Sequence, residues 1–166
     1  MMPEHTSDNL LIARSDQLVD SSPLHGAVHS FPPITMQVAS DSDQEPLWDH
    51  LVRRHHYLGY QKLLGHRIKY LAYIQDRPVA AISFSAPALK LRTRDKFIGW
   101  SSLQRKIYLD SIANNSRFLI LPWVEVKNLA SHVLAKALSR LSRDWEERFG
   151  KRLWLVETFV DPSLYR

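Results

Sequence analysis

Two carboxylates near the end of the sequence are the residues best suited to acid–base chemistry. Glu157 and Asp161 stand four positions apart in the run VETFVD, so a strand would point both side chains to the same face, roughly 13 Å apart. This separation is wide for a directly paired acid and base. We take both as candidate catalytic residues, with Glu157 as the stronger candidate for a general base. A solvent-facing or salt-bridged carboxylate is the alternative, because structural ion pairs also occupy strand ends.

A polar loop before a long apolar-periodic segment forms a second candidate site. Asn128, Ser131 and His132 lie where a helix is expected to begin, and the free backbone amides of a helix start attract anions. Ser131 lacks the Gly-x-Ser-x-Gly surroundings of a nucleophile elbow. The adjacent His55 and His56 cannot share a helix face. The pattern therefore predicts a ligand-binding loop and no metal site.

A third set of residues combines cations with an aromatic ring. Such a combination could hold phosphates and stack a base, as in sequence-tolerant binding of single strands. The alternative is a solvated helix face with the indole in the core. The members of the set are Arg92, Arg94, Lys96, Trp100, Arg105, Lys106 and Arg117.

Charge is distributed unevenly along the 166 residues. Residues 1–50 contain one Arg and eight acids, whereas the remainder contains 21 Lys and Arg against nine acids, within a net charge of +5. A basic body attracts polyanions, so nucleic acid is a possible partner, although basic domains without such a partner also occur. The absence of cysteine excludes disulfides and thiolate chemistry. No run of about 18 apolar residues is present, so we expect a cytoplasmic protein with no membrane partner.

The elements that would position these residues follow from periodicity and from turn signals. Residues 1–43 are expected to form a flexible acidic leader with one short strand at 34–38, and residues 44–166 a mixed α/β domain. The expected helices are 46–58, 101–112 and 129–149, and the expected strands are 68–74, 79–85, 118–124 and 153–160. A hairpin followed by a crossover predicts a mixed sheet with helices on its faces.

This order of elements resembles the acyl-CoA N-acyltransferase fold of the GNAT superfamily. In that superfamily the central strand opens into a pyrophosphate-binding loop of the type Val-x-Pro-x-x-Arg-Gly-x-Gly-x-Gly. Ile120 and Pro122 match that loop, but Glu125 stands in place of its arginine. Its glycines are replaced by Val126, Asn128 and Ala130. A carboxylate there would repel a diphosphate, so coenzyme A is disfavoured and the cofactor is left unknown.

Five blocks, in this order, carry a closer resemblance: HHYLG, RDKFIGW, NNSRFLILPWVEVKNLAS, DWEERFG and VETFVD. Together they resemble the DruA family of the Druantia anti-phage system, whose members also occur fused to or beside insertion-sequence transposases. The resemblance covers roughly residues 50–166. It implies a role in phage defence or in mobile elements, with nucleic acid and other defence-system or transposon proteins as partners, and it implies no established reaction. In that family the VETFVD block continues into Gly-Thr-x-Tyr and Ala-Ala-Asn-Trp, so the domain is expected to be C-terminally truncated.

Three functional hypotheses follow. The first is a nucleic-acid-associated component of a defence system or mobile element that uses the cationic set. The second is a GNAT-like transferase or other enzyme with a pocket at the loop from Glu125 to His132, together with Glu157. The third is an inactive scaffold or remnant, which is expected if the sheet exposes an apolar edge.

Overall fold

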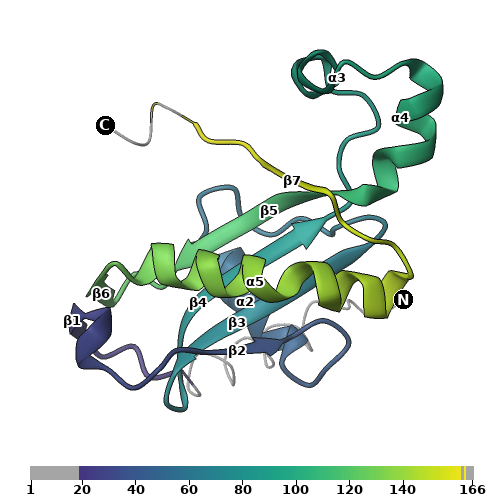
Figure 1. Cartoon of the computed structure of the whole chain (residues 1–166). Coiled ribbons are helices and arrows are strands. Elements are labelled where there is room, and N and C mark those ends of the chain that lie inside the picture. The colour runs from purple at the N-terminus through teal and green to yellow at the C-terminus, as the bar shows by residue number, and fades with distance from the viewer. Residues whose placement is uncertain (1–18, 162, 164–166) are drawn as a thin grey trace, which may run out of the picture.

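The computed structural model describes residues 19–161 and 163, and a five-stranded sheet forms its centre (Figure 1). The strand order is β2-β3-β4-β5-β7, in which every neighbouring pair is antiparallel except the parallel pair β5 and β7. The strands are β2 (Thr35–Val38), β3 (Arg67–Ile74), β4 (Arg77–Ser85), β5 (Ile112–Ile120) and β7 (Leu155–Thr158). The mixed α/β class predicted from the sequence is confirmed.

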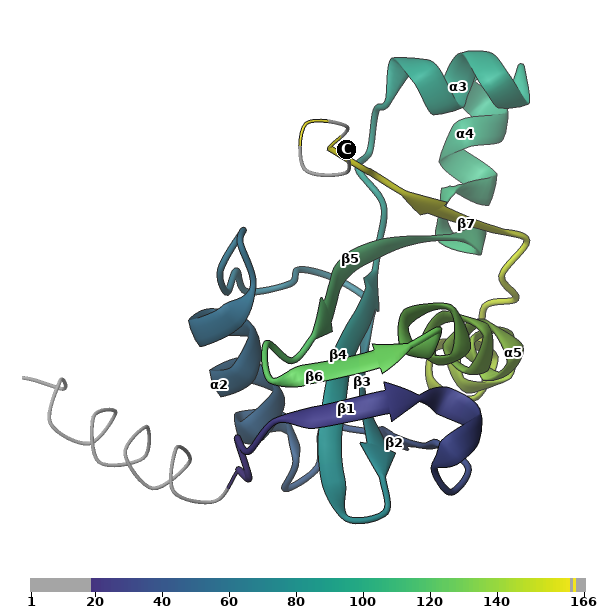
Figure 2. The ribbon, with the colours of Figure 1, turned by 90° about the vertical axis from the view of Figure 1, so that its left-hand side faces the viewer.

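Two helices cover opposite faces of this sheet. Figure 2 shows α2 (Glu45–His55) on one side and α5 (Leu129–Phe149) on the other. Because both faces are covered, nearly every residue of β3 and β4 is buried and the hairpin has no polar alternation. Trp48 of α2 and Trp145 of α5 are each about 1% exposed and fill the two layers. The bounds of α5 match the prediction, and Gly150 ends the helix in the left-handed region (φ 64°).

Two short helices form an arm that projects from the sheet beside β7 (Figure 1). They are α3 (Arg92–Ile98) and α4 (Ser102–Tyr108), and a 3-10 turn, η2 (Leu109–Ser111), leads from them into β5. Gly99 at φ 74° ends α3, and a reciprocal capping box between Ser101 and Gln104 begins α4. We call residues 91–108 the arm.

The predicted single helix at 101–112 is therefore wrong at its C-terminal end. Asn114 and Asn115 do not terminate a helix, because they are paired with Ser85 and Phe84 inside the sheet. Local preference for a turn yields here to the ladder of β4. The predicted strand at 118–124 is likewise wrong at both ends, since β5 begins at Ile112 and ends at Ile120.

The expectation of a flexible leader is wrong for residues 24–30. β1 (Leu24–Ala27) pairs in parallel with β6 (Val124–Lys127) to form a second, two-stranded sheet, and the turn η1 (Val28–Ser30) follows β1. β2 then joins the main sheet, as the predicted short strand requires. The domain thus begins before residue 44, and residues 1–18 lie outside the described part of the chain. Among the helices described, none has the length and apolar character needed to cross a bilayer.

Candidate functional site

A buried polar network joins the arm to β7. Arg94 of α3 is 3% exposed at its side chain, and its Nη1 donates to Glu157 Oε1 of β7 at 3.1 Å. Its Nη2 donates to the carbonyl of Ala88 at 2.8 Å. Asp95 accepts hydrogen bonds from Trp100 Nε1 at 2.9 Å and from Arg105 Nη1 at 3.1 Å. The contacts of Asp95 hold α3 against α4, and the contact of Arg94 attaches the arm to β7 at the edge of the sheet.

The network places Glu157 among structural ion pairs. Its carboxylate is 11% exposed and neutralised by Arg94, so the salt-bridged alternative describes its geometry. Its Oε2 is buried and accepts no hydrogen bond from the described residues, and neither does Oδ1 of its register partner Asn114. Glu157 could accept a proton only from a group that reaches this buried oxygen. Asp161 is exposed and accepts hydrogen bonds from Ser163, which lowers its pKa.

The cationic set divides into paired and free side chains. Arg94, Trp100 and Arg105 already have acidic partners in this network; Arg94 is buried, and Trp100 and Arg105 are half-buried, so their predicted contact with phosphates and bases would compete with these bonds. Arg117 is also engaged, because its Nε donates to the carbonyl of Gly59 at 3.0 Å. The remaining cations are exposed on the arm. They are Arg92, Lys96 and Lys106.

The predicted ligand loop lies at another end of the molecule. Asn128 adopts the left-handed conformation (φ 67°) before α5, and Ser131 and His132 are exposed on its first turn. Glu125 Oε2 lies 3.1 Å from His25 Nδ1 across the two-stranded sheet. A neighbouring carboxylate disfavours a diphosphate at this helix start.

Glu157 does not share a site with this loop. It is paired with Asn114, near the beginning of β5, whereas the loop follows the end of that strand. The six residue steps from Asn114 to Ile120 correspond to roughly 20 Å along a strand. The second hypothesis combined the two groups in one pocket, and the structure separates them.

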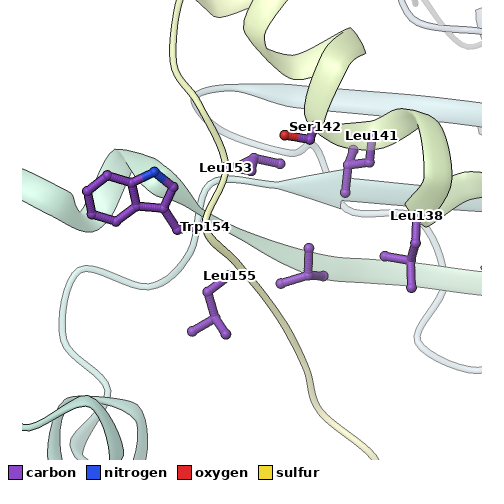
Figure 3. Close-up of a pocket in the computed structure, with 7 residues that line it drawn as sticks. Leu138, Leu141, Ser142, Leu153, Trp154 and Leu155 are labelled. Carbon is purple, nitrogen blue, oxygen red and sulfur yellow. The ribbon is translucent and has the colours of Figure 1, made fainter.

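Two cavities instead flank the beginning of β7. The smaller, about 130 Å³, lies between α5 and β7 (Figure 3) and is lined by Leu138, Leu141, Ser142 and residues 153–156. The larger, about 370 Å³, lies under the arm, and its aromatic lining consists of Phe97, Trp100, Tyr108 and Trp154. The rings of Tyr108 and Trp154 lie 5.3 Å apart. Among the described residues no group of three potential metal ligands is present.

Almost the whole chain matches a known protein family. The family model for Druantia protein DruA matches residues 6–165. The chain belongs to the DruA family. No curated protein is detectably similar to this DruA-family chain.

A solved structure similar to the DruA-family chain is the aminoglycoside antibiotic 6'-N-acetyltransferase AAC(6')-Ih from Acinetobacter baumannii. The two share 14% sequence identity with a TM-score of 0.45, over 80% of this chain and 84% of the acetyltransferase. The mixed α/β class of the DruA-family chain rests on its own strand order, described above.

The HHYLG block of the DruA-family chain, residues 55–59, begins at the last residue of α2 and contacts β5. His56 is 8% exposed, and its Nδ1 accepts the backbone N–H of Leu58 at 3.1 Å. Burial and the positive charge of Arg117 lower the pKa of His56 below its ordinary 6.5, although a hydrogen bond with the backbone of Phe118 opposes them. The imidazole is therefore neutral and positions the turn. The sequence argued against a metal site at these adjacent histidines, but it did not identify the contact of His56 with Leu58.

Sequence reasoning also missed Tyr108 and Trp154, which line the larger cavity of the DruA-family chain. Trp154 is 66% exposed although it begins an apolar run. The available signal was that the large ring of Trp154 follows the charged pair Lys151 and Arg152 shortly before a strand. Periodicity alone assigns such a ring to the core.

Proposed function

We propose that the chain is a nucleic-acid-binding component of a Druantia-type defence system and that the arm makes the contact. Membership of the DruA family supports the defence role. The arm supports the nucleic-acid role, and its exposed cations are the observation that carries the proposal.

Positive charge is concentrated around the arm. Residues 90–106 contain six Lys and Arg and one Asp, a net charge of +5, which equals the net charge of the whole chain. Arg94 and Arg105 of this segment are bound to acids, but Arg92, Lys96 and Lys106 are exposed. Within residues 19–161 and 163, no ion pair joins these three to an acid. Exposed cations of this kind bind phosphates and release counterions.

An exposed aromatic ring accompanies the cations. Phe97 follows Lys96 directly and is 86% exposed, which is unusual for a phenyl ring in a folded domain. A base stacked on such a ring adds affinity without sequence preference. We therefore expect single-stranded nucleic acid to bind better than a duplex of the same length.

The test is the salt dependence of binding to a fluorescent 20-nucleotide single strand and to the matching duplex. Replacing Arg92, Lys96 and Lys106 by Ala should lower the slope of log K against log salt by about 2 for the single strand, since each phosphate contact contributes about 0.7. Phe97→Ala should weaken binding to the single strand more than binding to the duplex.

A matched variant replaces Lys62, Lys127 and Lys136 by Ala and removes the same net charge from other parts of the surface. Its salt slope should equal that of the unmodified chain. Equal losses in the two triple variants would show diffuse attraction and refute the assignment to the arm. Absence of binding at about 50 mM salt would refute nucleic-acid binding altogether.

A further inference from the structure

The outer edge of β7 carries backbone groups that no described strand satisfies. β7 stands last in the sheet order. The N–H of Trp154, just before β7, donates to the carbonyl of Ser111 at 2.8 Å and so points toward β5. Because successive residues of a strand point their backbone groups to alternate sides, Leu155 and Glu157 present N–H and C=O to the outside. Such an edge is a template for an added strand.

Apolar side chains in and around β7 are open to solvent. The exposed fraction is 66% for Trp154, 37% for Val156, 58% for Phe159 and 62% for Val160. In Figure 3 the indole of Trp154 lies across the chain from Leu138 and Leu141. A patch of this kind on a folded domain indicates an interaction surface.

One cavity lies on the α5 side of β7 and the other on the arm side, and Trp154 and Leu155 line both. The smaller, about 130 Å³, lies toward α5 and includes Val156. The larger, about 370 Å³, lies toward the arm and includes Leu155. A cavity of about 150 Å³ is enough to hold a benzene ring, so the two can receive an aliphatic and an aromatic side chain. In an added strand, neighbouring side chains point to opposite faces and would reach both cavities.

We propose that β7 is a docking edge for an extended segment of a partner protein, which adds as a sixth strand and places two neighbouring apolar side chains in the two cavities. Backbone hydrogen bonds would supply affinity, and the cavities would select the side chains. The proposal does not depend on nucleic-acid binding, because β7 and its cavities carry it.

Charge identifies the kind of segment. Arg152 is exposed shortly before β7, whereas Lys151 lies 3.7 Å from Asp110, and the arm that walls the larger cavity carries net positive charge. A second copy of the chain would bring two such arms to one joined sheet, and like charges would oppose the contact. An antiparallel segment with Asp or Glu at its C-terminal end would place those acids beside Arg152. The partner segment is therefore extended, with two neighbouring apolar residues, and acidic at its C-terminal end.

The test uses a fluorescent ten-residue peptide in which Val and Leu are neighbours at the centre, Thr flanks them, and two Asp form the C-terminal end. The peptide should bind the full chain in an anisotropy titration. N-methylation of the two amides that would face β7 should weaken binding at least tenfold, since two backbone hydrogen bonds are lost. A scrambled peptide in which the apolar residues stand two positions apart, and so point to the same face, should weaken it similarly, and Lys in place of Asp should weaken it severalfold.

Two variants of the protein separate the backbone contact from the side-chain contact. Leu155→Pro removes an outward N–H, whereas Leu155→Ala keeps that N–H and removes the side chain. Binding should fall further for the proline variant, while its affinity for single-stranded DNA should stay unchanged. If circular dichroism shows that Leu155→Pro does not fold, the N-methylated peptide tests the same backbone hydrogen bonds by changing the peptide in place of the protein.

Three results would overturn the proposal. The first is no binding of the acidic peptide at millimolar concentration. The second is equal affinity of the N-methylated and unmodified peptides. The third is a dimer of the chain in sedimentation that Leu155→Ala dissociates, because the edge would then belong to a second copy.

Discussion

Replacing Arg94 with Met tests whether its ion pair with Glu157 holds the arm to the sheet. The Arg94 side chain is 3% exposed and that of Glu157 is 11% exposed, so water screens the pair little. Removing one partner of a buried pair leaves an uncompensated charge and costs about 3–5 kcal/mol. The loss of the bond to the carbonyl of Ala88 acts in the same direction. We expect Arg94→Met to lower the free energy of unfolding by about 3–5 kcal/mol.

The double variant Arg94→Met with Glu157→Met gives the sharper result. Replacing both members of a buried pair by apolar residues is often neutral or stabilising, so the double variant should lie within about 2 kcal/mol of the unmodified chain. Urea unfolding followed by tryptophan fluorescence and by far-ultraviolet circular dichroism measures all four members of the cycle.

A loss below about 1 kcal/mol in Arg94→Met would refute this reasoning, because that value is typical of a screened surface pair. Glu157 would then be free to act on a ligand, and its role as a candidate general base would regain support. Additive losses in the double variant would also refute it, since the two charges would not be coupled.

Two further predictions concern buried polar groups. Because the folded pKa of His56 is lowered, its contribution to stability is present above pH 6.5 and is lost as the pH falls through the folded pKa. His56→Asn keeps an acceptor for Leu58 N–H, so the stability difference from the unmodified chain should shrink between pH 7.5 and 5 in urea titrations; parallel curves would contradict this. The Tyr70 hydroxyl donates to the buried carboxylate of Asp144 at 2.9 Å, so Tyr70→Phe should cost about 1.5–3 kcal/mol. Tyr73→Phe loses a bond to the neutral amide of Gln44 and should cost about 0.5–1.5 kcal/mol; equal thermal shifts for the two variants would contradict the assignment.

The helices and strands that the sequence predicted well are those with a signal in their own residues or in the adjoining turn. The apolar period of α5 and its closing Gly150 gave both ends of that helix, and the turn between β3 and β4 gave the hairpin. β1 had no such signal, because its partner β6 lies about 100 residues further along the chain. α3 was not predicted, because its charged run was not read as a helix and Gly99 was not recognised as a helix end.

The site was harder to predict than the fold because it depends on pairing across the chain. Arg94 stands in a charged run, which favours a solvated cation, yet its partner Glu157 lies 63 positions away. Arg92 and Lys96 of the same run are exposed, as a charged run favours. The composition of the segment therefore predicted where positive charge is concentrated, but it did not predict which of these cations is buried.

The parallel pairing of β1 with β6 has a consequence for synthesis of the chain. Leu24 is paired with Val124, so β1 cannot find its partner until about 100 further residues have been translated. At about 5–20 residues per second this takes roughly 5–20 s. β2 needs a much shorter wait, since it pairs with Tyr70 and its neighbours. During that interval the segment at 24–27 emerges from the ribosome with its backbone unpaired, and a chaperone that binds extended chain would meet it before its own partner does.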